Sequence, residues 1–166
     1  DENTAMVNVL EHSRVKRSLV VDLADHHARC EINYHLCMSL FPGCRGEQTS
    51  WSFTLDGLRD AAVRAELEEV APYTSMLLIK QTYLAPFYLQ APQLRVRLYH
   101  DVGMAEVIAW NRHRHWRPVY QYPNPNMYQP DEKMALNRFL GELLVHCRKM
   151  GIARNPICES IRINKN

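Results

Sequence analysis

The sequence predicts an α+β domain in which a helix near each end of the chain flanks an antiparallel sheet of about six strands. Two observations indicate this class. Apolar residues recur at helical spacing near both ends, and short apolar or alternating runs fill the middle of the chain. Strands that follow one another between helices are typical of an antiparallel sheet with helices on one face. The 166 residues, 46% of them hydrophobic, suffice for one such domain.

The first helix is expected after a polar stretch, residues 1–18, which we interpret as a mobile arm. Asp22 suits the N-cap position, and Pro42–Gly43 ends the helix. The residues expected to form its apolar face recur at helical spacing and are Leu23, His27, Cys30, Tyr34, Cys37, Met38 and Phe41.

Six strands are expected in the middle of the chain, and Pro118 places the last of them at an edge of the sheet. The run around Leu77 is the most apolar, which favours a central position. If the strands form a simple meander, successive turns alternate between the two ends of the sheet. The expected strands are residues 49–55, 62–70, 73–83, 93–101, 104–110 and 116–122.

The last helix is expected to begin at Pro130 and to end before Gly151. Asp131 and Glu132 lie in its first turn, where negative charge favours the helix dipole. Its apolar stripe consists of Leu136, Leu140, Leu143, Leu144 and Cys147. The chain is therefore divided into the arm at residues 1–18, a single domain at 19–151 and a loosely attached tail at 152–166.

The segment VRLYHDVGMAEV, residues 96–107, predicts a hairpin with a polar tip. A two-residue loop at Val102–Gly103 would place Tyr99 opposite Glu106 across the hairpin. His100, Asp101 and Glu106 are then the candidate catalytic residues, because a histidine beside carboxylates can transfer protons or bind a metal. His100 and Asp101 are adjacent on a strand and therefore point to opposite faces, which argues against their cooperation. The favoured alternative is an exposed ion pair between Arg97 and Glu106 beside the hairpin tip.

The meander brings four polar turns to one end of the sheet, although they are distant in the sequence. A binding site for a small ligand or a protein partner is expected at this end. Its candidate residues are Tyr73, Thr74, Tyr99, His100, Asp101, Tyr122, Asn124 and Asp131.

The five cysteines predict reduced thiols in a cytoplasmic protein, since an odd number is spread over a mid-sized chain. His26, His27, Cys30 and Cys37 recur at helical spacings that could present ligands on one side of the first helix. Zinc sites, however, normally join one close ligand pair to a second pair elsewhere, and no such spacing is present. No metal and no cofactor is therefore expected.

The segment NRHRHWR, residues 111–117, combines basic and aromatic residues without an acid. Arg112, Arg114, Trp116 and Arg117 could contact RNA through phosphates and stacked bases, although an exposed hairpin loop is the favoured interpretation. The net charge of +2 argues only weakly for a nucleic acid. No apolar run is long enough to cross a membrane.

Six separated segments together resemble the YqiB-like family, small bacterial cytoplasmic proteins built on a domain of unknown function. The segments are CEINY, LFP, YTSMLLIKQT, VRLYHDVGMAEV, YPNPNM and DEKMALNRFL, in this order. The resemblance spans roughly residues 17–151 and implies no reaction. It emphasises Tyr99, His100, Asp101, Glu106, Tyr122, Pro123, Asn124, Asp131, Glu132, Lys133 and Asn137, where the sequence matches the family pattern.

No nucleophile elbow, phosphate-binding loop or dinucleotide fingerprint is present, so the sequence favours a binding or adaptor protein over an enzyme. The alternatives are a small metal-assisted hydrolase using His100 and nearby carboxylates, and an RNA-binding protein using the basic segment.

Overall fold

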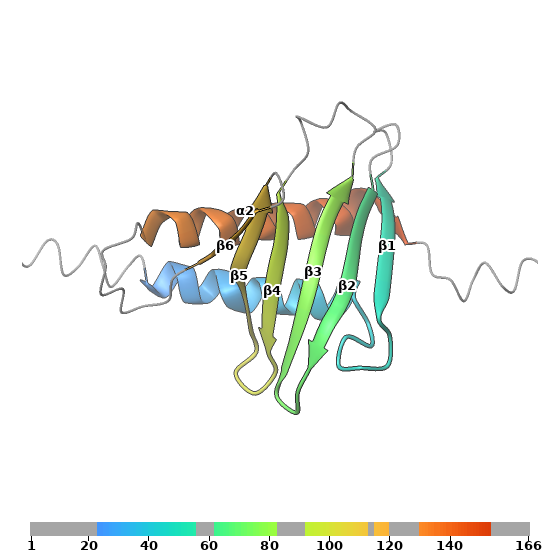
Figure 1. Ribbon diagram of the computed structural model, residues 1–166, viewed down its shortest axis with the longest axis horizontal. Coiled ribbons are helices and arrows are strands. Elements are labelled where there is room, and N and C mark those ends of the chain that lie inside the picture. Colours follow the sequence, from blue (N-terminus) through green and yellow to red (C-terminus); the bar gives the residue numbers. More distant parts are fainter. Residues whose placement is uncertain (1–22, 56–61, 83–91, 113–114, 120–129, 154–166) are drawn as a thin grey trace, which may run out of the picture.

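The computed structural model describes residues 23–55, 62–82, 92–112, 115–119 and 130–153. It confirms the predicted α+β class. The strands are β1 (Ser50–Leu55), β2 (Ala62–Val70), β3 (Thr74–Thr82), β4 (Gln93–Tyr99), β5 (Met104–Arg112), β6 (His115–Pro118) and β7 (Gly151–Ala153). The helices are an N-terminal helix over residues 23–40 and α2 (Pro130–Met150), and both cross the same face of the sheet (Figure 1).

The sheet is an antiparallel meander in the order β6-β5-β4-β3-β2-β1-β7. The predicted meander and the edge position of the strand that contains Pro118 are therefore confirmed. The short strand β7 is an addition that the sequence analysis did not predict, and it pairs with β1 directly after α2. Gly151 makes this abrupt exit possible, because a Cβ atom there would collide with the carbonyl of Cys147.

The face of the sheet beneath the helices carries the core. β4 alternates strictly, with Leu94, Val96 and Leu98 fully buried between partly exposed neighbours. β3 is the most buried strand, and its opposite face also buries Met76 and Leu78. Long charged side chains lie on that second face, where Arg95 pairs with Glu68.

The predicted apolar stripe of α2 is confirmed, since Leu140, Leu143, Leu144 and Cys147 are buried in the core. The stripe predicted for the N-terminal helix is wrong in its first half. Leu23 is 37% exposed and His27 is exposed, whereas the buried positions are His26, Cys30 and Asn33. From residue 36 onward the buried positions are apolar and belong to Leu36, Cys37, Leu40 and Phe41.

The two helices lie side by side and run in the same direction (Figure 1). Asn33 of the N-terminal helix donates from its Nδ2 to the backbone oxygen of Asn137 on α2 at 3.0 Å. Gly141, one turn further along α2, is buried where a Cβ atom would lie 2.9 Å from the Asn33 side-chain oxygen. A glycine at this position therefore permits the close approach of the helices.

Several predicted features lie outside the described residues: the arm at residues 1–18, the N-cap Asp22, and the site residues Tyr122 and Asn124. Within the part of the chain that the structure describes, no helix is both long and apolar enough to cross a membrane.

Candidate functional site

Two turns lie side by side at one end of the sheet, between β2 and β3 and between β4 and β5 (Figure 1). We call residues 71–73 and 100–103 the paired turns. The backbone N–H of His100 donates to the carbonyl of Tyr73 at 2.8 Å, and Thr74 is the register partner of Tyr99. Five of the expected site residues, those from these two turns and the adjoining strand ends, are thus brought together.

The hairpin differs from its prediction in loop length. Four residues, 100–103, form the loop, so Tyr99 pairs with Met104 and Arg97 pairs with Glu106. The predicted opposition of Tyr99 and Glu106 is therefore wrong, although the Tyr99 hydroxyl still reaches Glu106 Oε1 diagonally at 3.3 Å. Gly103, with a φ of 64°, takes the left-handed conformation that closes the longer loop.

His100 bridges two hydroxyl groups from different elements. Its Nδ1 lies 3.1 Å from the hydroxyl of Tyr34 on the N-terminal helix, and its Nε2 lies 2.7 Å from Ser75 Oγ on β3. Burial lowers the pKa of His100, and the positive charge of Arg45 lowers it further, against an opposing effect of Asp101.

The pair of Ser75 and His100 has the atoms of a nucleophile and its base, but its placement does not suit catalysis. Ser75 is only 2% exposed, so its hydroxyl has little access to a substrate. The nitrogen that a carboxylate would orient in a catalytic triad faces Tyr34 instead. His100 therefore acts as a structural link that ties the paired turns to the N-terminal helix.

The paired turns expose large apolar side chains around this link. Tyr73 is 66% exposed, Val102 is 60% exposed, and Val70 at the end of β2 is 50% exposed. Asp101 is also exposed beside them. Large exposed apolar side chains that gather at one end of a sheet are typical of an interaction surface.

Asp131 lies away from the paired turns, in the first turn of α2. The next residue, Glu132, accepts a hydrogen bond from Trp110 Nε1 at 2.8 Å. Trp110 is near the far end of β5, because β5 begins at Met104 beside the loop. The start of α2 thus reaches the far end of β5 through Glu132, whereas Lys133 contacts Glu106 nearer the loop.

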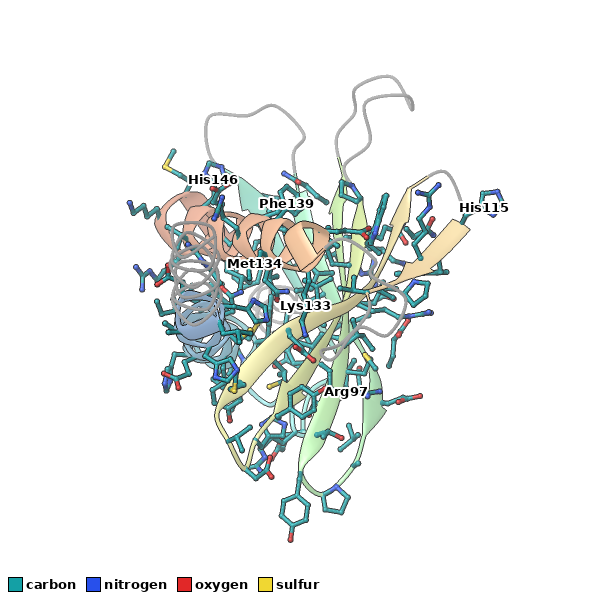
Figure 2. The ribbon with its side chains drawn as sticks, turned by 90° about the vertical axis from the view of Figure 1, so that its left-hand side faces the viewer. Arg97, His115, Lys133, Met134, Phe139 and His146 are labelled. Carbon is teal, nitrogen blue, oxygen red and sulfur yellow. The ribbon has the colours of Figure 1, made fainter. Side chains whose placement is uncertain are left out.

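A buried polar seam joins both helices to the sheet. Lys133 Nζ lies 3.2 Å from Glu106 Oε2, and the two side chains are only 10% and 14% exposed. Figure 2 shows Lys133 between α2 and the strands. A charge buried at this depth is costly without its partner, so each of the two ions requires the other. We call Asn33, Tyr99, Glu106, Lys133 and Asn137, together with His26 and Cys30, the polar seam.

Asn137 provides a second connection within the polar seam. Its Oδ1 accepts a hydrogen bond from the backbone N–H of Val107 at 3.0 Å, and its Nδ2 donates to the Lys133 carbonyl at 2.8 Å. Three of the segments that carry the family resemblance, CEINY, VRLYHDVGMAEV and DEKMALNRFL, therefore meet here. Asn33 Oδ1 is buried and has no hydrogen-bond partner among the described residues.

His26 and Cys30 complete the polar seam from successive turns of the N-terminal helix. The Cys30 sulfur lies 3.6 Å from His26 Nε2. Burial, assisted by the charge of Glu106, raises the pKa of the Cys30 thiol to about 12. Burial and the charge of Lys133 lower the pKa of His26. At neutral pH the pair is therefore a thiol beside a neutral imidazole.

A groove of about 440 Å³ lies between the N-terminal halves of the two helices. The N-terminal helix contributes His26 and Arg29, and α2 contributes Met134 and Arg138. His26 thus belongs both to the groove and to the polar seam. The remaining lining residues are Asp25, Ala28 and Ile32.

Guanidinium groups lie over two tryptophan rings, one in the basic segment and one directly before it. The Arg95 guanidinium lies 4.0 Å from the Trp116 ring centroid, and the Arg117 guanidinium lies 5.4 Å from that of Trp110. These contacts occupy ring surface that a nucleic-acid base would use. The Arg112 side chain and Arg114 lie outside the described residues.

The spacing of His26 and Cys30 indicated ligands on one helix face, but no metal was expected there, and Asn33 was missed because apolar periodicity alone was followed. His26 and Asn33 are polar residues on a buried helix face. The partner of Asn33 is Asn137, which is 104 positions away in the sequence. His26, Cys30, Asn33 and Cys37 recur at helical spacing along one face. This recurrence of polar residues together with cysteines is the signal that could have identified the buried face.

These features define a class of protein: an α+β fold with one antiparallel sheet, two parallel helices on one face, a buried polar seam and two exposed paired turns. The chain belongs to the family described as "Protein of unknown function (DUF1249)", whose model matches residues 36–153. It is 33% identical over 130 residues to the uncharacterized protein YqiB of Escherichia coli K12. The alignment covers 77% of this chain and 89% of that protein.

The YqiB proteins of Escherichia coli O6:H1 and O157:H7 show the same identity and coverage. No solved structure matches the chain significantly. The resemblance that the sequence predicted is therefore confirmed at the level of the family.

Proposed function

We propose that this chain is a cytoplasmic binding module that recognises a protein partner through its paired turns. The observation that carries the proposal is the gathering of Val70, Tyr73 and Val102, each at least half exposed, at one end of the sheet. Tyrosine is enriched among the residues that dominate the binding energy of protein interfaces, and exposed apolar side chains that gather on one surface mark interaction sites.

Rigidity of the surface supports this proposal. The two turns are joined to each other by the His100 to Tyr73 backbone hydrogen bond. They are joined to the N-terminal helix by the bridge from His100 to Tyr34. A surface fixed in this way loses little conformational entropy when a partner binds.

Exposed Asp101 beside the apolar groups gives the surface a charged rim, which suits a partner that carries a basic side chain next to an apolar pocket. The cytoplasmic setting is supported by the four described cysteines, all of which are free and buried.

The proposal is tested by photo-crosslinking in living bacteria that express the full chain. A benzophenone amino acid replaces Tyr73 in one sample and Ile32 in a matched control. Ile32 is 56% exposed on the N-terminal helix, away from the paired turns. We expect a discrete adduct from position 73 that contains one protein, and none of the same mass from position 32.

Val102→Ser in the chain that carries the crosslinker at position 73 should greatly reduce this adduct. The absence of any adduct from position 73, or an equal adduct from both positions, would contradict the proposal. An adduct that disappears after ribonuclease treatment would contradict it too, and would favour the RNA-binding alternative.

A further inference from the structure

Three side chains of the polar seam offer ligand atoms of different chemistry within one small volume. His26, Cys30 and Glu106 present a nitrogen, a sulfur and an oxygen, and these atoms all lie within 4.8 Å of one another. His26 and Cys30 are four residues apart on one helix face, and Glu106 reaches them from β5. We infer that these three residues form a binding site for a divalent ion of the zinc class.

The separation of the two helix ligands fits such an ion. Bonds of about 2.0 Å to nitrogen and about 2.3 Å to sulfur at a tetrahedral angle place the two ligand atoms about 3.5 Å apart. His26 Nε2 and Cys30 Sγ lie 3.6 Å apart in this structure. The helix therefore already holds its two ligands close to the required distance.

The donor set selects the kind of ion. A thiolate, an imidazole and a carboxylate together suit zinc or cobalt, whereas magnesium and calcium prefer oxygen ligands alone. The neutral imidazole of His26 has a lone pair available, and the ion would displace the proton of the Cys30 thiol when it binds.

The surroundings of Glu106 resemble the outer partners of a ligating carboxylate. Lys133 Nζ contacts one carboxylate oxygen at 3.2 Å, and the Tyr99 hydroxyl lies 3.3 Å from the other. Such contacts orient a ligating carboxylate in metal sites. Lys133 also offsets the second negative charge that a thiolate adds to the site.

Three protein ligands leave a fourth position of a tetrahedral ion for water or an exogenous group. His26 also lines the groove between the helices, together with Arg29 and Arg138. The two guanidinium groups outnumber the one carboxylate of the groove, Asp25, so a carboxylate or phosphate is the class of ligand that the ion would share with the groove.

This inference departs from the sequence-based expectation of no metal. Ligand spacing along the chain indicated only residues of the first helix, namely His26, His27, Cys30 and Cys37. Glu106, 76 positions after Cys30, joins His26 and Cys30 only through the packing of the N-terminal helix beside β5.

The test uses Co²⁺ and Zn²⁺ with the purified full chain. We expect one Co²⁺ per chain, with the absorption bands of tetrahedral cobalt and a sulfur-to-cobalt charge-transfer band, and displacement of Co²⁺ by Zn²⁺. Cys30→Ser should abolish the charge-transfer band, and His26→Gln should weaken Co²⁺ binding by about tenfold or more.

Two cysteine variants serve as matched controls. Cys37→Ala removes another buried thiol of the same helix, and Cys158→Ala removes the cysteine outside the described residues. Both should retain the cobalt spectrum. Circular dichroism tests whether each variant is folded. If Cys30→Ser is unfolded, the cobalt spectra of His26→Gln and Glu106→Gln test the site in its place. A folded native chain that binds neither ion, or a spectrum unchanged in the folded ligand variants, would overturn the inference.

Discussion

His100 is a catalytic candidate in the sequence, and in the structure it links two elements of the fold. Both ring nitrogens face hydroxyl groups, Tyr34 on one side and Ser75 on the other. A protonated imidazole would have to donate from both nitrogens in a partly buried setting beside Arg45. The neutral ring is therefore the form that the fold favours, and this preference has a measurable consequence.

The stability of the chain should fall with acid in a way that depends on His100. Because the fold lowers the pKa of His100, the unfolded chain binds the proton more readily than the folded chain below the ordinary histidine pKa of about 6.5. The free energy of unfolding should therefore decrease as the pH falls through 6.5 toward the lowered pKa of the folded state. Above this window His100 is neutral in both states and contributes no pH dependence.

His100→Gln should flatten this decrease, as measured by urea unfolding at several values between pH 7.5 and pH 5. Some decrease remains in the variant, because burial also lowers the pKa of His26. Equal pH dependence in the native chain and in His100→Gln would contradict the bridging role.

At the scale of elements, the two helices differ in how well the sequence described them. α2 carries apolar residues at every buried position of its second half, so its periodicity predicted the core. The N-terminal helix buries His26, Cys30 and Asn33 in its first half, whereas the predicted stripe contained Cys30 together with the exposed Leu23 and His27. Polar groups can occupy a buried face only where another element satisfies them, and that element is not visible in the local sequence.

The apolar stripe of α2 should be essential for the fold. Leu140 and Leu144 are fully buried against the sheet, so replacing either with Ala removes apolar contacts and leaves a cavity. Leu140→Ala and Leu144→Ala should each lower the free energy of unfolding by about 2–5 kcal/mol. Glu142→Ala, on the exposed side of the same helix, should change it by less than about 0.5 kcal/mol and serves as the control.

A loss below about 1 kcal/mol for both leucine variants, measured by denaturant unfolding, would mean that the packing of α2 on the sheet is misassigned.

At the scale of the whole molecule, the meander was predictable because its strands are short, contiguous and strongly alternating. It correctly placed the turn at Tyr73 beside the turn at His100. The length of the hairpin loop was not predictable, because residues 102–103 and residues 100–103 both suit a turn and only the register of β4 against β5 decides between them.

The polar seam was hidden from the sequence for a related reason. Glu106 and Lys133, which form an ion pair, are 27 positions apart in the sequence. Asn33 and Asn137, which share a hydrogen bond, are 104 positions apart. The family resemblance emphasised three of these residues, Glu106, Lys133 and Asn137, without indicating that they meet. Only the packing of two parallel helices on one face brings them together.

That the paired turns serve recognition and not folding is tested most directly by the stability of one double variant, Tyr73→Ser with Val102→Ser. Both side chains are mostly exposed, so their removal costs few contacts. The free energy of unfolding should stay within about 0.5 kcal/mol of the native value. A loss of several kcal/mol would show that these side chains hold the fold together, and would contradict their assignment to a partner.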